Sequence, residues 1–372
     1  MTSLDPALAR TPLFDLHLEL GARMVGFGGY ALPVQYAGGI KHEHLATRTG
    51  AGLFDVSHMG QIVVNGPPAA LEALVTSDIA GLGPGQQRYS VLTSDSGGIL
   101  DDLMVLRLPE GLHVVVNAAY KTADFAHLQR GLARSCEVRM HHDRALIALQ
   151  GPAAAQVLEP LCPGAGTLMF MQGARLAIGG CDCIVTRSGY TGEDGYEISV
   201  PAEAAIALAR RLLASGAVTP VGLGARDSLR LEAGLCLSGA DIGPEITPVE
   251  AALEFVIARK YLGSGALPAQ FPGAARILHE RAHGARRRRV GLIVQGRVPV
   301  RAGASVQAAD GRVVGTVTSG GFGPTLERPL ALAMVARECA VPGTVLTVTV
   351  RAQAHAVEVV TLPFVPHRYH QH

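Results

Sequence analysis

The stretch Ser305-Val-Gln-Ala-Ala-Asp-Gly-Arg-Val-Val-Gly-Thr-Val-Thr318 decides the fold of the C-terminal part of the chain. Asp310-Gly311 is a strong signal for a two-residue hairpin between two strand-like runs. Three further runs of this kind lie nearby: Val290 to Val294, Thr344 to Val350 and Ala356 to Thr361. Several short strands separated by turn residues predict a small all-β barrel or sandwich from about Arg289 onward. Lys260 to Gly284, rich in Gly, Ala and Pro, is expected to be the connection into it.

Outward from this region, the rest of the chain mixes helical and strand-like patterns. Helical periodicity occurs at Pro67 to Leu74, Lys121 to Leu132, Ala153 to Leu158 and Ala202 to Leu213. Strand-like runs occur at Gln61 to Val64, Arg88 to Leu92, Leu103 to Leu108, Leu112 to Val116, Leu146 to Leu149 and Cys183 to Thr186. Turn residues between the runs predict an antiparallel meander over residues 88–118. No Gly-x-Gly-x-x-Gly segment follows a strand and no phosphate loop is present, so a dinucleotide or nucleoside triphosphate site is unsupported.

Length and composition describe a globular protein of two or three domains. The chain has 372 residues, of which 48% are hydrophobic and 17% charged. No apolar run reaches eighteen residues, and the net charge is +1, so neither a membrane nor nucleic acid is expected as a partner. The segment Met1 to Pro6 lacks the features of a secretion signal or a mitochondrial presequence, which favours a cytoplasmic protein.

Three polar or reactive groups are interpreted as structural. The basic run Arg286 to Arg289 is expected to be a solvated linker leading into a strand, although a localisation or nucleic-acid patch is the alternative. The six cysteines have neither zinc-site nor disulfide spacing and are expected to be reduced. His42-x-His44 has no third ligand nearby, so a solvated helix face is favoured over a metal site, and no metal is expected in catalysis.

Asp101-Asp102 is the first candidate site, because two carboxylates lie between apolar residues on both sides. In a strand, neighbouring side chains point to opposite faces, so only one of the two can enter a given cavity. A buried carboxylate without partners is costly and is often functional. Alternatively, one Asp caps the Gly97-Gly98 turn and the other faces water.

Arg187-Ser-Gly-Tyr-Thr-Gly-Glu-Asp-Gly-Tyr-Glu-Ile-Ser-Val200 is the second candidate, a Gly-rich loop that ends in a strand. Such a loop lets the backbone approach a flat ligand while Tyr190 or Tyr196 stacks on it. Glu197 can accept two parallel N–H bonds from a guanidine-like edge. The alternative is a turn-rich surface hairpin.

The third candidate lies in Gly222 to Gly234, where Arg226, Asp227 and Arg230 open a short helix. Arg226 near the helix start could bind an anion or a carbonyl edge. The alternative is a structural salt bridge from Arg226 to Asp227 or Glu232.

Together with these three segments, further motifs resemble the aminomethyltransferase family in colinear order from about Thr11 to Tyr369. They are Thr11 to Leu13, Phe27 to Tyr36, Leu53 to Met59, Leu149 to Pro152, Ser319 to Leu326 and Pro363 to Pro366. Each motif is weak alone, but the ordered set is specific. Two positions depart from the family pattern: Tyr30 replaces a frequent Trp and Gly323 a frequent Ser.

The resemblance implies an α+β, three-domain, cloverleaf-like folate-binding fold with a C-terminal β-barrel domain. It implies a discontinuous first domain of residues 1–55 and 140–245, a second of 56–139 and 246–280, and a barrel of 285–372. It further implies transfer of the aminomethyl carbon from the lipoylated H-protein of the glycine cleavage system to tetrahydrofolate as the acceptor substrate. Ammonia, dihydrolipoyl H-protein and 5,10-methylenetetrahydrofolate would result.

By position, the resemblance assigns the catalytic carboxylate to Asp102. It assigns folate contacts to Glu197, Arg226, Tyr369, Tyr89, Tyr190 and Val116. A carboxylate suits the reaction because folate nitrogens must lose protons and positive charge must be stabilised.

Two other readings of the chain stay open. A folate-dependent demethylase, or the detached folate domain of a sarcosine- or dimethylglycine-oxidising enzyme, would share the folate residues. A non-catalytic folate protein of iron–sulfur assembly is less compatible, because the stretch Arg187 to Asp194 lacks the cysteine typical of that relative.

Overall fold

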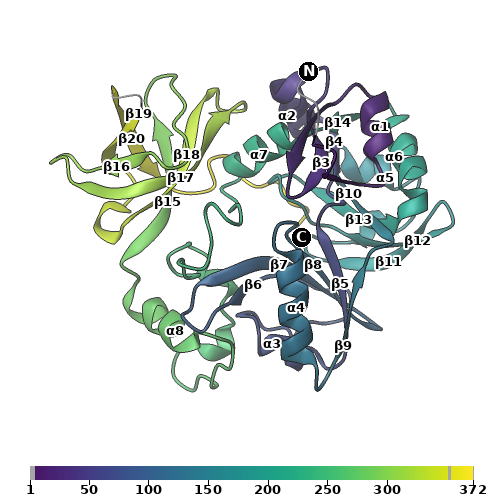
Figure 1. Ribbon diagram of the computed structural model, residues 1–372, viewed down its shortest axis with the longest axis horizontal. Helices are drawn as coiled ribbons and strands as arrows, with labels where there is room; N and C mark the ends of the chain where they lie inside the picture. The colour runs from purple at the N-terminus through teal and green to yellow at the C-terminus, as the bar shows by residue number, and fades with distance from the viewer. Residues whose placement is uncertain (1–4, 351–352, 372) are drawn as a thin grey trace.

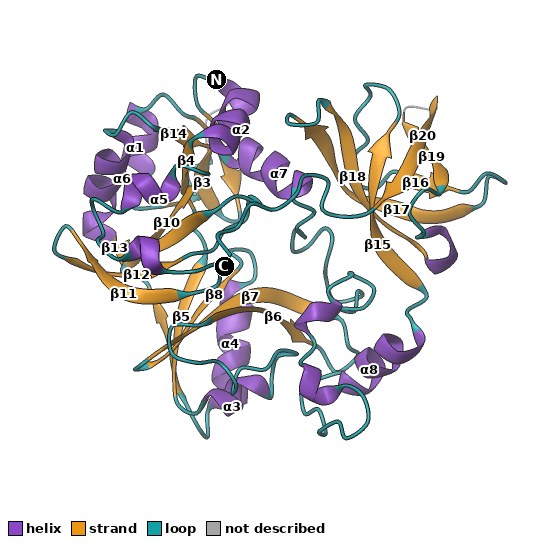
Figure 2. Ribbon diagram, turned by 180° about the vertical axis from the view of Figure 1, so that it is seen from behind, coloured by secondary structure: helices purple, strands orange, loops and turns teal. Residues whose placement is uncertain are grey.

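The computed structural model describes residues 5–350 and 353–371. Its elements gather in three lobes around a common centre, where the C-terminus also lies (Figure 1). The last lobe is a closed β-barrel, and the other two combine helices with sheets (Figure 2). This arrangement confirms the predicted α+β fold with a C-terminal barrel. Residues 1–4 of the segment Met1 to Pro6, used above to predict location, lie outside the described residues.

The first lobe is built on a six-stranded sheet of order β11-β12-β13-β10-β4-β14, antiparallel except for the pair β4 and β14. Its strands are β4 (Ala51–Asp55), β10 (Arg144–Gln150), β11 (Gly173–Ile178), β12 (Cys181–Thr186), β13 (Gly195–Pro201) and β14 (Val218–Val221). A small sheet beside it contains β1 (Ala9–Arg10), β2 (Arg23–Phe27) and β3 (Tyr30–Gln35). The helices are α1 (Phe14–Glu19), α2 (Gly39–Thr49), α5 (Ala154–Leu158), α6 (Ala205–Leu213) and α7 (Leu223–Glu232), with 3-10 turns at Ala165–Thr167 and Ala202–Ala204.

Helix α6 shows why the periodic segments fold as predicted. Its buried residues are Ala205, Leu208, Ala209 and Leu212, at the spacing of one helical face, and they join the core of the sheet. Arg210 and Arg211 lie on the opposite, exposed face. Burial of one apolar face against the sheet therefore stabilises the helix.

The second lobe holds an antiparallel sheet of order β6-β7-β8-β5-β9. Its strands are β5 (Gly60–Asn65), β6 (Gln87–Thr93), β7 (Ile99–Leu108), β8 (Gly111–Val116) and β9 (Glu137–His141). Helices α3 (Pro68–Glu72) and α4 (Lys121–Leu132) cover one face, where their leucines share a core with β5, β7 and β8. The neighbouring order of β6, β7 and β8 confirms the meander predicted for residues 88–118.

The connection between the second lobe and the barrel is more ordered than its composition indicates. It contains 3-10 turns at Glu254–Val256 and Arg259–Tyr261 and the ten-residue helix α8 (Ala274–His283). Lys260 to Gly284 does connect to the barrel, as predicted, but the sequence pattern gave no indication of the helix in its second half. The glycines and prolines that hid this helix precede it, and Ile277 anchors the helix in a local core.

The barrel closes in the order β15-β18-β17-β16-β19-β20. Its strands are β15 (Arg287–Val294), β16 (Ser305–Gln307), β17 (Val313–Gly323), β18 (Arg328–Ala336), β19 (Val345–Val350) and β20 (Gln353–Val360), with a 3-10 turn at Arg337–Cys339. Closure leaves the barrel without an unpaired edge strand.

The hairpin at Asp310-Gly311 exists, but its loop has three residues instead of two. The Ala308 N–H donates to the Arg312 carbonyl at 3.0 Å, which leaves residues 309–311 as the loop. Gly311 has φ +84°, the left-handed conformation that a glycine adopts without strain. The turn is therefore the three-residue type, in which a left-handed residue follows a tight turn.

The basic run is not a solvated linker, because most of it belongs to β15. Arg287 pairs with Glu250 at 2.8 Å, and Arg288 pairs with Glu254. Arg289 is buried and donates to the carbonyls of Ala251 and Gly234. These arginines tie the barrel to the segment before α8.

The prediction of a solvated helix face is wrong for His44. It is fully buried in α2, where its ring nitrogens contact Ser228 Oγ at 2.7 Å and Glu232 Oε2 at 3.0 Å. His42 is exposed as expected. His44 therefore joins α2 to α7.

We propose that the domain boundaries follow the three lobes, with residues 1–55 and 140–245, 56–139 and 246–280, and 285–372 as the units. The strands of the first sheet and of the barrel each fall within one unit, and the first sheet draws on both parts of its discontinuous unit. In the second sheet, only β9 (Glu137–His141) crosses a boundary, the one at residue 139. Among the described helices, none combines the length and the apolar character needed to cross a membrane.

Candidate functional site

Asp101 and Asp102 lie within β7 and point to opposite faces of its sheet. Asp101 is fully buried and accepts hydrogen bonds from the Asn117 backbone N–H (3.1 Å), Asn117 Nδ2 (2.9 Å) and Ser238 Oγ (2.6 Å). The Gly97-Gly98 turn is instead closed by its own backbone, with the Gly97 N–H donating to the Ser94 carbonyl. The alternative in which one Asp caps this turn and the other faces water is therefore wrong.

Asp102, on the other face of the sheet, has two hydrogen-bond donors on its carboxylate. Tyr89 donates its hydroxyl at 2.9 Å, and Asn117 Nδ2 donates at 2.6 Å. Burial raises the pKa of Asp102 to about 7, the negative charge of Asp101 adds to this, and the two donors oppose it. A carboxylate with this pKa can take up and release a proton near neutral pH.

The loop before β13 is folded inward, so the alternative of a surface hairpin is wrong. No residue from Arg187 to Val200 is fully exposed. Arg187 is buried and binds both carboxylate oxygens of Asp194, at 2.9 and 2.6 Å, and this pair fixes the loop.

Glu197, on β13, accepts one side-chain hydrogen bond, from Ser188 Oγ at 3.1 Å. Burial raises the pKa of Glu197, while the positive charge of Arg226 opposes that shift. The carboxylate therefore has lone pairs left for a ligand.

Arg226 lies in the first turn of α7, with its guanidinium 4.8 Å from the centre of the Tyr190 ring. The Tyr190 hydroxyl donates to the carbonyl of Cys236. Within the part of the chain that the structure describes, the Arg226 side chain makes no hydrogen bond or ion pair.

The carboxylates that could have paired with Arg226 have other partners. Asp227 pairs with Arg230 at 2.7 Å. Glu232 binds His44 and Arg48, both at 3.0 Å. The structural salt bridge considered for Arg226 is therefore wrong, and its guanidinium remains able to bind an anion or a carbonyl group.

Tyr369 belongs to a C-terminal segment that returns from the barrel to the first lobe. Its ring stacks on Phe170, with ring centres 4.0 Å apart and planes 4° apart. The neighbouring Arg368 donates its backbone N–H to the Gly192 carbonyl and its guanidinium to Glu193. Tyr369 is thus held against the loop that carries Tyr190.

Val116 and Tyr196, the two remaining candidates, are buried in the core. Val116 is fully buried opposite Leu103 in β7, so its side chain lies in the core on the face away from Asp102. Tyr196 is also fully buried, with its ring beneath Arg187, so it cannot stack on a ligand. Of the two tyrosines considered for stacking, only Tyr190 is partly exposed.

The structure brings Asp102 together with Tyr89, and Arg226 together with Tyr190 and Glu197. Charges of Asp102 and Arg226 both act on Tyr190, which links the two groups. Asp102, Glu197 and Arg226 lie deep among protein atoms, yet each keeps some water-accessible surface. A ligand could cover this surface.

Sequence reasoning missed Asn117 and Ser238, which bind the aspartate pair. Asn117 directly follows the predicted strand Leu112 to Val116, so a polar residue at a strand end was the available signal. Ser238 lies 137 residues from Asp101 and had no local signal.

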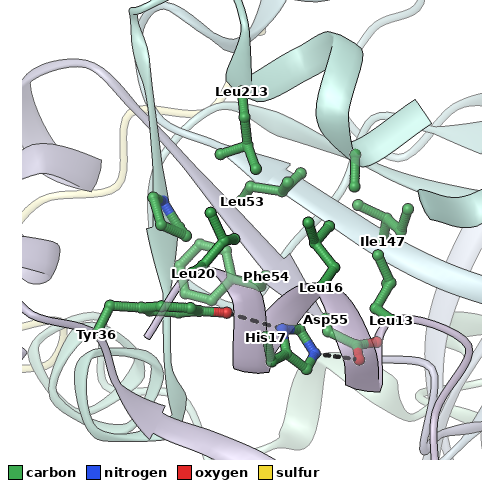
Figure 3. Close-up of a pocket in the computed structure, with 12 residues that line it drawn as sticks. Leu13, Leu16, His17, Leu20, Tyr36, Leu53, Phe54, Asp55, Ile147 and Leu213 are labelled. Atoms are coloured by element: carbon green, nitrogen blue, oxygen red, sulfur yellow. Dashed lines mark hydrogen bonds and ion pairs between the residues drawn. The ribbon is translucent and has the colours of Figure 1, made fainter. Parts of the chain in front are cut away.

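A small hollow in the first lobe is a different feature (Figure 3). His17 lies between Tyr36 (2.9 Å) and Asp55 (2.8 Å), and Thr11 donates to the same Asp55 oxygen at 2.6 Å. The rest of the lining is mainly leucine side chains. Because these polar groups satisfy one another, the network is interpreted as structural.

Comparison with known proteins gives matches over most of the chain. The GCVT N-terminal domain matches residues 13–261, and the glycine cleavage T-protein C-terminal barrel domain matches residues 287–366. The mitochondrial aminomethyltransferase of Mus musculus is 44% identical, over 100% of this chain and 93% of its own length. The probable mitochondrial aminomethyltransferase of Schizosaccharomyces pombe is 42% identical, over 100% and 96%.

The crystal structure of glycine cleavage system aminomethyltransferase T from Bartonella henselae superimposes with a TM-score of 0.90 at 44% identity, covering 98% of this chain and 100% of that one. The eukaryotic relatives are named mitochondrial, so these names do not support the cytoplasmic location expected from the sequence. The extent of the matches and the identity show that the chain belongs to the glycine cleavage T-protein family.

Proposed function

We propose that the protein transfers the aminomethyl carbon of a lipoyl-bound donor to tetrahydrofolate, with Asp102 as the acid–base group. The single observation that carries this is the Asp102 carboxylate, which is partly buried, is hydrogen-bonded to Tyr89 and has a pKa raised to about 7. Family membership supplies the reaction class.

The residues around Asp102 suit a folate. The pterin edge presents two N–H donors, and Glu197 has carboxylate lone pairs free to accept both. Arg226 offers an unpaired guanidinium to carbonyl or anionic groups. Tyr190 and Tyr369 offer aromatic faces or edges to the folate rings. Val116 could contribute only through its backbone, because its side chain lies in the core.

The reaction balances without an oxidant. The carbon–sulfur and carbon–amine bonds of the donor break, and two bonds form between that carbon and folate nitrogens. The two folate N–H protons end on ammonia and on the lipoyl sulfur. Asp102 can accept a folate proton and pass it on, because its pKa is close to neutral pH. Its negative charge also stabilises positive charge that develops beside it.

The carbon donor and the cellular location of the protein also belong to the proposed function. The donor is the lipoylated H-protein of the glycine cleavage system, whose arm must reach the partly exposed Asp102. The expected cytoplasmic location is kept as part of the proposal and is tested by cell fractionation.

The experiment is a turnover assay with aminomethylated H-protein and tetrahydrofolate, following 5,10-methylenetetrahydrofolate. Product that requires protein, donor and folate together is expected. Folate binding without this product, or one-carbon transfer only from a methylated amine, would contradict the proposal and favour the non-catalytic or demethylase reading.

A further inference from the structure

Asp124 is a buried carboxyl group with no role in the reaction described above. It lies in the first turn of α4 and is 4% exposed. Its Oδ2 atom is buried and receives no hydrogen bond from any N–H or O–H donor in the described residues. An ionised carboxylate in that situation would be costly, so this group needs an explanation.

The Asp101 carboxylate lies on the sheet face that α4 covers, the face on which Leu103 and Val105 pack against the leucines of α4. A hydrogen bond between the Asp101 and Asp124 carboxyl groups is one of the causes that raise the pKa of Asp124. Two carboxyl groups can hydrogen-bond to each other only if one carries a proton. Burial raises the pKa of Asp124, and the negative charge of Asp101 adds to the shift.

Asp101 is the better anion of the two, because three donors from Asn117 and Ser238 stabilise its negative charge. The proton therefore resides on Asp124. Its carboxyl group then supplies Asp101 with a fourth donor, from the side of α4.

The hydrogen bonds of Asp101 matter for Asp102 through Asn117. The Nδ2 atom of Asn117 lies 2.9 Å from Asp101 Oδ1 and 2.6 Å from Asp102 Oδ1, so one amide group holds both carboxylates. A shift of Asp101 would rotate this amide and change the position of Asp102.

We propose that Asp124 is a positioning residue whose protonated carboxyl group donates to Asp101 and thereby fixes the Asp101–Asn117 unit that orients Asp102. The effect on turnover rests on the proposed function of Asp102, whereas the shared proton does not. Asp124 contacts neither the folate candidates nor the reacting atoms, so it should affect kcat and leave KM unchanged.

Other charged groups around α4 do not compensate Asp124. On its own helix, Lys121 donates its ammonium to the Tyr30 hydroxyl (2.7 Å) and the His58 carbonyl (2.9 Å). On the elements packed against α4, the charged residues have other partners: Glu72 with Lys260, Glu137 with Arg139 and His141 with Asp143. The charges that act on Asp124 are thus those of Asp101 and Asp102.

The shared proton is tested by thermal and denaturant unfolding of wild type and Asp124→Asn between pH 4 and 9. In the unfolded chain an Asp loses its proton above about pH 4, whereas folded Asp124 keeps it, so folding takes up a proton. The folding equilibrium constant of the wild type should therefore fall, by up to about tenfold per pH unit, relative to Asp124→Asn. Asp15→Asn is the matched control, since Asp15 lies in the first turn of α1 and is exposed.

Convergence of the two proteins near pH 4 and a growing advantage of Asp124→Asn toward pH 8 are expected. Parallel profiles from pH 4 to 9 would overturn the shared proton. This arm needs no turnover, so its outcome is separate from that of the proposed function.

The positioning role is tested by kcat and the KM for tetrahydrofolate. Asp124→Asn keeps an N–H donor toward Asp101 and should retain kcat within about twofold. Asp124→Ala removes the donor and should lower kcat by about tenfold or more at unchanged KM. Normal kcat in Asp124→Ala would refute the positioning role, and equal losses in both variants would show that the donor is not what matters. If Asp124→Ala does not fold, Ser238→Ala removes a donor to Asp101 from the other side and should lower kcat in the same way.

Discussion

Replacing Glu197 by Gln tests the assignment of the folate-recognising carboxylate. The variant keeps the size of the side chain and the acceptor for Ser188 but exchanges one oxygen for an NH2 group. The variant loses one charge-assisted hydrogen bond to the pterin edge, which should weaken the binding free energy of folate by about 1.5–3 kcal/mol. Because 1.4 kcal/mol is a factor of ten, the Kd for tetrahydrofolate should rise about 10- to 150-fold. Glu197→Ala should cost more, since both bonds disappear and Arg226 loses its opposing charge.

The assay is equilibrium binding of tetrahydrofolate by titration calorimetry, with Glu203→Gln as a control on an exposed carboxylate. A change in kcat smaller than the change in Kd is expected, because Glu197 binds the ring and does not transfer the proton. A Kd within twofold of wild type for Glu197→Gln and Glu197→Ala would refute the reasoning.

The remaining predictions concern pH, stability and the C-terminal segment. Turnover should rise with pH through about 7 as Asp102 ionises. The hydrogen bond from Tyr89 lowers the pKa of Asp102, so its loss in Tyr89→Phe should raise that pKa and move the rise in kcat to higher pH. An unchanged profile of kcat against pH would contradict this. Glu232→Ala leaves its buried arginine and histidine partners without an acceptor and should lower the unfolding free energy by about 3–5 kcal/mol in urea titrations, whereas a loss below 1 kcal/mol would disprove the network. Phe170→Ala removes the stacking partner of Tyr369, and the lost aromatic contact is worth about 0.5–1.5 kcal/mol. The Kd for folate should therefore rise about 2- to 12-fold. An unchanged Kd would show that Tyr369 does not take part in folate binding.

Elements with strong periodicity were predictable because their stability depends on one apolar face. The predicted helix Lys121 to Leu132 coincides with α4, and its leucines Leu128 and Leu132 are buried as the pattern requires. Helix α8 was missed because it buries one residue fully, Ile277, and so shows little periodicity. Local pattern therefore predicts an element only where burial is extensive.

Burial of polar residues was the main feature that sequence could not predict. His44 and Arg289 look like solvated groups in the sequence, yet both are buried by partners from distant segments. Glu232 reaches His44 across 188 residues, and Arg289 reaches Gly234 across 55. Such pairs are set by the packing of lobes and barrel, which periodicity does not encode.

The candidate site divides in the same way. The residue types around Asp102, Glu197 and Arg226 indicated three candidate sites. The ordered motifs then assigned catalytic or folate-binding roles to these residues by family resemblance. The face of Val116 depended on strand register, and the hydrogen bonds of Asn117 and the burial of Asp124 depended on which side chains pack against β7. Those facts require the three-dimensional structure.

The measurement that tests the central claim most directly is the coupled turnover assay in wild type and Asp102→Asn, with Asp95→Asn as an exposed control from the same β6–β7 hairpin. The proteins are given aminomethylated H-protein and tetrahydrofolate, and 5,10-methylenetetrahydrofolate is followed. Folate-dependent product in wild type and Asp95→Asn is expected, with a loss of at least about a hundredfold in kcat for Asp102→Asn, as for removal of a general acid–base group, and little change in folate affinity. Normal turnover by Asp102→Asn would remove this carboxylate from the mechanism.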